Sequence, residues 1–275
     1  MTALSSELST AWAYDFVRTA AVAGTVCAAL ASCVGYFVLL RRMAFAAHAL
    51  GHISFAGACA GVILSCGALP GMLALNVIAA TGMGFMGERV QKSDLVVGMT
   101  LSFALGLGTL FLSLFKGYAG QANVILFGNL LAISHGQLWG MALLAGGSLL
   151  ALLAMFRPLL FSSLEPELAE AKGVPLRLIS VTFYLLVAIA VAVASQMMGV
   201  LLVFALLVGP AAIAQRLCHT VWPGILVGLA IAVAVTWISL ILAYVTDWPV
   251  SFWVPSLLFA VYVPSTLLRN LRFNT

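Results

Sequence analysis

The chain has 275 residues, of which 64% are hydrophobic and only 7% charged, with a formal net charge of +4 at neutral pH. A soluble globular protein carries about 25% charged residues, so this composition excludes an ordinary soluble domain. The apolar runs are continuous and near the ~20 residues that a helix needs to cross a bilayer, whereas a membrane β-barrel would show alternating runs of about ten. The sequence therefore predicts an all-α, polytopic transmembrane helix bundle that occupies residues 1–275 as a single domain.

Apolar stretches along the chain predict eight or nine membrane spans. We expect them at about 16–40, 45–67, 70–86, 95–115, 138–156, 177–195, 197–217, 222–245 and 254–268. The third stretch is short and follows the second after only Leu69-Pro70-Gly71, so eight spans with a re-entrant segment is an alternative. Between the fourth and fifth spans, residues 116–137 are partly apolar. They predict a short helix against the membrane face, with a turn permitted by Gly128 and Asn129.

The distribution of basic residues predicts the orientation of these spans. With nine spans and the N-terminus outside, ten of the twelve basic residues face the cytoplasm, as the positive-inside rule requires. These ten are Arg41, Arg42, Arg89, Lys92, Arg157, Lys172, Arg177, Arg216, Arg269 and Arg272. We therefore expect a multi-pass protein of the cell membrane, the inner membrane in a Gram-negative cell, with its C-terminus in the cytoplasm.

Two histidines in the second span are the best candidates for chemistry. His48 and His52 lie four residues apart, so a helix places them on one face, where two imidazoles can ligate one transition-metal ion. At ~1.5 Å per residue from Arg42 they lie near mid-membrane, where ionisable side chains usually face a cavity or a partner. The alternative is a neutral pair that bonds to backbone or to Ser54 inside the bundle. The spacing favours a transient metal site on a translocation path, with no stably bound cofactor.

The loop between the fifth and sixth spans predicts a short cytoplasmic helix. Pro166 suits a first helical turn, with Glu165 and Glu167 near its positive end, and Ala169 falls within it. Gly173 suits a helix stop. The element is either an ordinary solvated helix or a docking site for a cytoplasmic partner, and Arg89–Asp94 is the next candidate for docking.

The seventh predicted span contains Gly209-Pro210. Proline removes a backbone hydrogen bond and clashes one turn back, so the pair predicts a kink that could serve gating. Proline is also common in membrane helices, so the kink alone does not indicate a function.

Five motifs occur in the order typical of one family, and through them the chain resembles the zinc/manganese class of ABC transporter permeases over nearly its whole length. They are R-R-M-A-F-A-A-H-A-L-G-H-I-S-F-A-G (Arg41 to Gly57), D-x-x-x-G (Asp94 to Gly98), L-F-G-x-x-L (Leu126 to Leu131), E-P-E-L-A-E-A-K-G (Glu165 to Gly173) and G-V-L-L-V-x-A-L-L-x-x-P-A-A (Gly199 to Ala212).

The first motif departs from the family pattern at two positions. His48 stands where the family usually has aspartate, and Gly51 where it usually has serine. Exchanging a hard carboxylate for imidazole favours zinc over manganese. Direct transfer of the family's Asp–His pair to this chain is therefore in doubt.

The resemblance implies a permease subunit that is not itself an enzyme and imports a divalent transition metal, zinc being favoured and manganese or iron being alternatives. It implies a homodimer with the path between the two copies, a separate ATP-binding cassette ATPase docked at Glu165–Gly173, and an extracytoplasmic metal-binding protein. Membrane lipid is the remaining partner, and no nucleic acid is expected. The chain has no G-x-x-x-x-G-K-[ST] loop for ATP, which agrees with a separate ATPase.

Two other functions remain open at this stage. A permease for a siderophore or corrinoid would keep the fold and have a wider path with fewer histidines. An ion-coupled secondary transporter would need internal repeats and buried carboxylates, and the spans contain almost no acidic residues.

Overall fold

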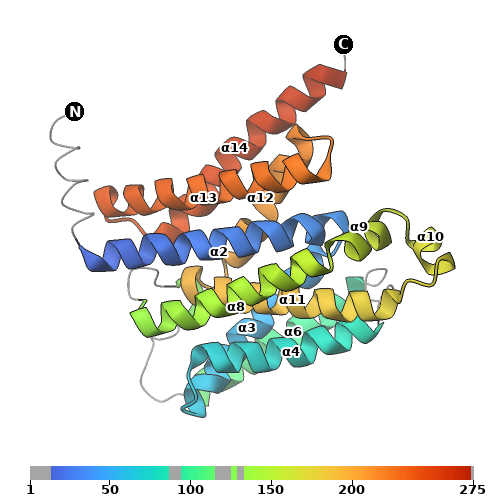
Figure 1. The fold of residues 1–275 in the computed structure, drawn as a ribbon. Coiled ribbons are helices and arrows are strands. Elements are labelled where there is room, and N and C mark those ends of the chain that lie inside the picture. The colour runs from blue at the N-terminus through green and yellow to red at the C-terminus, as the bar shows by residue number, and fades with distance from the viewer. Residues whose placement is uncertain (1–13, 87–93, 115–124, 129–132, 274–275) are drawn as a thin grey trace.

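The computed structural model describes residues 14–86, 94–114, 125–128 and 133–273. The described helices form one bundle (Figure 1), which confirms the predicted all-α fold. Their bounds are α2 Asp15–Leu40, α3 Ala44–Ile63, α4 Ala68–Met86, α6 Asp94–Leu114, α8 His135–Ala154, α9 Phe156–Leu164, α10 Pro166–Ala171, α11 Leu176–Met198, α12 Val203–Leu217, α13 Val221–Thr246 and α14 Val250–Phe273.

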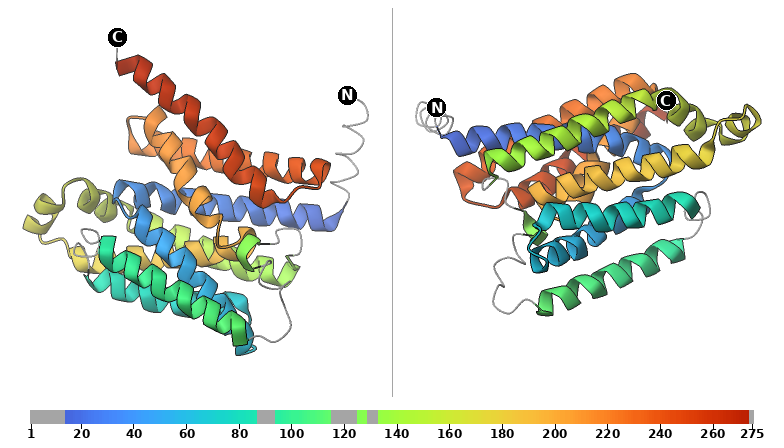
Figure 2. Two further views of the ribbon diagram at one scale, coloured as in Figure 1. Left: turned by 180° about the vertical axis from the view of Figure 1, so that it is seen from behind. Right: turned by 60° about the horizontal axis from the view of Figure 1, so that its bottom comes forward.

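Eight of the described helices are long and apolar enough to cross a membrane. They lie roughly side by side, as two further views show (Figure 2). In the most apolar stretches of α3 and α11, 72% of the residues are buried, against 17% in α6 and α14. Burial therefore separates the helices at the centre of the bundle from those at its periphery. The seventh predicted span, at 197–217, corresponds to α12, which has only 15 residues and falls short of these eight.

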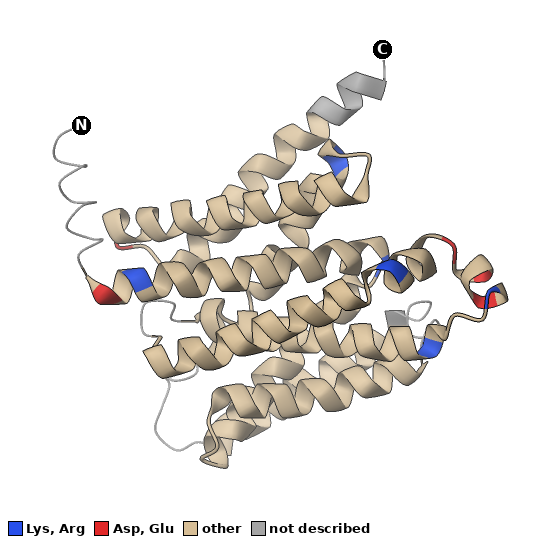
Figure 3. Cartoon of the chain, in the orientation of Figure 1, with Lys and Arg blue, Asp and Glu red and all other residues tan. Residues whose placement is uncertain are grey.

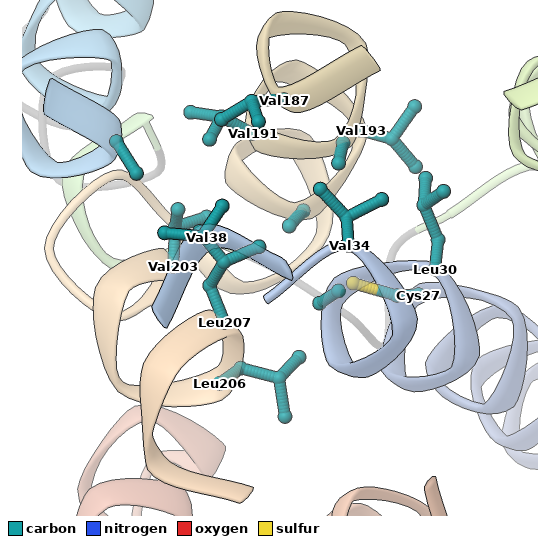
Figure 4. Close-up of a cluster of buried hydrophobic side chains, with 14 of the residues drawn as sticks. Cys27, Leu30, Val34, Val38, Val187, Val191, Val193, Val203, Leu206 and Leu207 are labelled. Carbon is teal, nitrogen blue, oxygen red and sulfur yellow. The ribbon is translucent and has the colours of Figure 1, made fainter. Parts of the chain in front are cut away.

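The core is a contact between α2, α11 and α12. Figure 4 shows its aliphatic side chains converging from the three helices, among them Val34, Val191 and Leu207. Gly35 allows this contact, because a methyl group there would overlap the carbonyl of Leu207. The backbones of α2 and α12 therefore approach more closely than any larger residue would permit.

Charged residues gather at the two ends of the bundle and leave an uncharged band between them (Figure 3). One end, here called the α10 end, carries the α10 helix and the start of α11; the other, here called the α2 end, carries the start of α2. Helix α2 begins at the α2 end and α14 ends at the α10 end (Figure 1). Helix α12 is a shorter apolar helix beside the eight candidate spans.

Small residues set the distance between α3 and α4. The backbone of Gly71 faces that of Gly57 and Gly61, and a Cβ atom on Gly71 would lie 2.7 Å from the Gly61 Cα. This is closer than real Cβ contacts allow, so only glycine fits. In contrast, a Cβ on Gly147 of α8 would have nothing within 4 Å.

We expect Gly71→Leu to separate α3 from α4 and to destabilise the protein by about 1–3 kcal/mol, as overpacking does in tight cores. Thermal unfolding of the purified chain should show a midpoint lowered by several degrees. Gly147→Leu is the matched control and should leave the midpoint unchanged. Equal midpoints for the two variants would contradict the close packing of α3 on α4.

Candidate functional site

The predicted histidine pair lies on α3, as the spacing required. The Nε2 atoms of His48 and His52 are 3.3 Å apart, and their rings are nearly perpendicular, with centroids separated by 4.8 Å. Both side chains are half-buried. One of these ring nitrogens can donate a hydrogen bond to the other, with the tautomers of the two rings chosen accordingly.

This geometry suits a shared metal ion. Two nitrogen ligands on a tetrahedral zinc, with bonds of about 2.0–2.1 Å, lie about 3.3–3.4 Å apart. The observed Nε2–Nε2 separation of 3.3 Å already matches that edge. Within the described ranges, no group of three or more His, Cys, Asp or Glu side chains could hold a metal. One chain therefore offers two imidazole ligands at this place, which is half of a tetrahedral shell.

The alternative partner that the sequence suggested for the histidines is engaged elsewhere. Ser54 is fully buried, and its Oγ accepts a 2.7 Å hydrogen bond from Nδ2 of Asn76 on α4. The same amide donates to the carbonyl of Ala188 on α11 at 3.2 Å. Asn76 thus joins α3, α4 and α11 and fixes the helix that carries the histidines. Nothing in the local sequence around Asn76 indicated this role.

A break between α11 and α12 lies opposite the histidines. The ring of Phe204, in the first turn of α12, contacts the edge of His48 with centroids 5.0 Å apart. A methyl group on Gly51, between the two histidines, would lie 3.7 Å from the carbonyl oxygen of Val200. Gly51 is near the middle of α3, so the break is level with the middle of that helix rather than with its end.

A second segment stabilises this break. The amides of Val200 and Leu201 donate to the carbonyls of Ile125 and Leu126, at 3.3 Å each. Gly199 has a φ of 85°. Within residues 116–137, the described part includes a short helical turn at 125–127, and Gly128 has a φ of 72°, which agrees with the predicted turn. Asn129 lies outside the described residues.

The structure corrects the prediction for the seventh span. A single kinked span was expected at residues 197–217, but residues 199–202 interrupt the helix and α12 begins at Val203. The helix then continues through Gly209 and Pro210. A Cβ on Gly209 would lie 3.1 Å from Leu258 of α14, so this glycine admits a neighbouring helix.

A cavity of about 340 Å³ lies on the α2-end side of the break. Its walls include Met197 and Met198 at the end of α11, and Asp247 after α13. Asp247 ends α13 in a left-handed conformation, with a φ of 56°, and its side chain is exposed. The cavity therefore offers a carboxylate and two thioethers next to the break, which are groups that attract cations.

The short helix predicted at Glu165–Gly173 is present at the opposite end. Helix α10 begins with Pro166 at its first position and ends at Ala171, and Gly173 follows its C-cap residue with a φ of 75°. The amides of Gly173 and Val174 donate to the carbonyls of Glu170 and Ala169, which is a Schellman C-cap. Ala169 is buried, whereas Glu165 and Glu167 are exposed and free to meet a partner. Residues 89–93 of the other docking candidate lie outside the described residues.

Comparison with known proteins places these features in a family. Residues 13–269 match the profile of the ABC 3 transport family. The chain is 29% identical to the manganese transport system membrane protein MntC of Halalkalibacterium halodurans over 207 residues, which are 75% of this chain and 71% of that protein. It is 28% identical to the high-affinity zinc uptake system membrane protein ZnuB of Haemophilus influenzae over 219 residues, 79% of this chain and 83% of that protein.

A solved structure has the same fold. It is that of PsaBC from Streptococcus pneumoniae in complex with Fab, and it superposes with a TM-score of 0.85 at 23% sequence identity. The match covers 95% of this chain and 94% of that one.

Proposed function

Because the chain belongs to the ABC 3 transport family and is the membrane permease subunit of a metal ABC transporter, we propose that His48 and His52 line its path and hold the metal in transit. A multi-pass permease of this family is not an enzyme, and a separate ATPase and a binding protein work with it. The observation that carries the proposal is the 3.3 Å separation of the two Nε2 atoms opposite the α11–α12 break.

A second copy of the chain would complete the metal shell. Two imidazoles from one copy and two from its partner in a homodimer make a tetrahedral set of four nitrogens. Each pair stays hydrogen-bonded to itself when the ion is absent. The ion must break that hydrogen bond when it binds, and the bond re-forms when the ion leaves. This competition keeps metal binding weak enough for the ion to be released.

Zinc is the cargo we propose. Relatives named for manganese and for zinc are both similar to this chain, so the choice depends on the residues. Manganese prefers carboxylate, carbonyl and water ligands, whereas imidazole suits zinc. With histidine at position 48 and no acidic side chain among the described neighbours of the pair, the site favours the softer ion.

The path we propose runs from the α2 end, which faces the outside, to the α10 end, which faces the cytoplasm. The cavity beside Asp247 receives the ion from the binding protein, and the break next to Phe204 separates it from the histidines. The basic residues at the α10 end support this orientation under the positive-inside rule. Helix α10 then faces the ATPase.

Replacing both histidines by alanine should abolish metal-dependent growth of a strain that relies on this transporter when a chelator limits the metal. The imidazole ligands would be lost while the helix stays intact. Growth and the amount of protein in the membrane are measured together. His219→Ala, at an exposed histidine outside the path, is the matched control and should grow normally. Normal growth of a well-expressed double variant would rule out the pair as the transit site.

His48→Asp should shift selectivity from zinc toward manganese, because it replaces imidazole by a hard carboxylate. Uptake of the two ions by proteoliposomes that contain the permease and its ATPase, with the binding protein added, gives the ratio. We expect the zinc-to-manganese ratio to fall several-fold. An unchanged zinc-to-manganese ratio in an active variant would show that position 48 does not set the choice of metal. Whether the metal passes through the histidine pair at all is tested separately, by the double alanine variant.

Gly173→Val should uncouple ATP hydrolysis from transport or weaken assembly. A β-branched residue resists the positive φ that ends α10, at a cost of about 1–3 kcal/mol. Gly173→Asn is the matched control, because asparagine tolerates this conformation. ATPase stimulation by the loaded binding protein is measured in the reconstituted complex. If the valine variant assembles and keeps normal stimulation and uptake, α10 is not the coupling element.

A further inference from the structure

A second, larger cavity opens at the α10 end, away from the histidines. Its volume is about 1000 Å³, and it lies between the ends of α2 and α4, the helices α9 and α10, and the start of α11. Three arginines line it, Arg41, Arg42 and Arg177, against one glutamate, Glu170. The excess of positive charge indicates that the cavity is suited to an anion rather than to the transported metal.

Two of these arginines are held in place by aromatic rings. The guanidinium of Arg41 lies 5.6 Å from the ring centroid of Phe183, and one of its nitrogens donates to Oγ of Ser162 at 3.2 Å. The guanidinium of Arg177 lies 5.1 Å from the ring of Phe85. Stacking on a ring orders a guanidinium, and that of the exposed Arg177 can turn its edge to a planar or tetrahedral anion.

Arg42 occupies a position that favours glycine. The amides of Arg42 and Met43 donate to the carbonyls of Leu39 and Val38, so α2 ends in a Schellman motif with Arg42 in the left-handed position, at a φ of 56°. A side chain there costs free energy that glycine would avoid. The strain is consistent with a guanidinium that serves the cavity.

The rest of the lining combines three serines, Ser162, Ser163 and Ser180, with apolar side chains at the α10 end of the bundle. Phe85, Met86 and Leu164 line the cavity, and all are about half exposed. Leu176 and Arg177 also line the cavity, and they form the N-terminus of the 23-residue helix α11. The helix dipole places a partial positive charge at this end. A free inorganic anion would use the arginines and not the apolar wall. An amphipathic anion would use both.

We propose that this cavity binds the phosphate of an anionic phospholipid from the cytoplasmic leaflet, with the arginines on the headgroup and Phe85, Met86 and Leu164 along the acyl chains. Basic pockets between helices on the cytoplasmic side of membrane proteins recognise such headgroups. The cavity includes residues of α10 and of the start of α11, so a bound lipid brings together the end of α2, α4 and the element that faces the ATPase.

The test uses the full chain, purified in a neutral detergent and titrated with short-chain phosphatidylglycerol, short-chain phosphatidylcholine or inorganic phosphate. The thermal unfolding midpoint is followed against the concentration of each. We expect phosphatidylglycerol to raise the midpoint and the other two to have little effect. An equal rise with phosphatidylcholine would overturn the proposal, and an equal rise with inorganic phosphate would show a site for a small anion instead of a lipid.

The double variant Arg42→Gly with Arg177→Gln removes two charges, and glycine at position 42 relieves the backbone. We expect its half-saturating concentration of phosphatidylglycerol to rise by roughly tenfold or more. Arg157→Gln with Lys172→Gln removes the same charge outside the cavity and should bind like the wild type. Wild-type affinity in the first variant would overturn the proposal. If this variant no longer co-purifies with the ATPase but binds the lipid as tightly as the wild type, the cavity is a contact site for the ATPase and not a lipid site.

A second measurement does not depend on any variant. Native mass spectrometry of the wild-type chain extracted from bacterial membranes should retain anionic phospholipid in preference to phosphatidylethanolamine. Retention of no lipid, or of lipids in the proportions of the membrane, would contradict the site.

Discussion

The backbone contact at the break between α11 and α12 is the constraint on which the rest of the site depends. Irregular backbone at membrane depth is tolerated only where protein satisfies its polar groups. Here Val200 and Leu201 donate to the carbonyls of residues 125 and 126. Gly199 and Gly128 allow the two segments to touch, since a Cβ on either glycine would overlap the other chain segment. Once the break is fixed, it sets Phe204 against His48 and opens the cavity beside Asp247.

The two polar groupings in the middle of the bundle have different consequences. Asn76 bonds to Ser54 and to the carbonyl of Ala188, so its hydrogen bonds cross three helices and fix their positions. His48 and His52 bond to each other. A hydrogen bond of this kind contributes only about 0.5–1.5 kcal/mol net. The bond within the histidine pair is therefore weak enough for the proposed metal ion to open, whereas Asn76 holds three helices together.

Features with a local pattern were predictable from the sequence. The apolar runs gave the helices, the spacing of four placed His48 and His52 on one face, and Pro166 and Gly173 marked the bounds of α10. The position of the break was predicted only approximately, because the sixth and seventh spans were expected to meet near residue 196, whereas residues 199–202 interrupt the helix. The contacts that stabilise the break were not predictable. Val200 and Leu201 bond to residues 75 positions earlier in the chain, and no local periodicity reports a contact of that range.

The position of the break also changes how motion would reach the histidines. A single helix connects α10 to the break. Helix α10 leads through residues 172–175 into α11, which runs unbroken for 23 residues, about 34 Å at the usual rise. The far end of α11 is the break itself, next to Gly51 and Phe204. If α10 docks the ATPase as proposed, its displacement would travel along one helix and arrive where the irregular backbone faces His48 and His52, the proposed metal ligands. The hydrogen bonds of Val200 and Leu201 are long, at 3.3 Å each, and join separate segments, so we expect them to change before the bonds within α11 do.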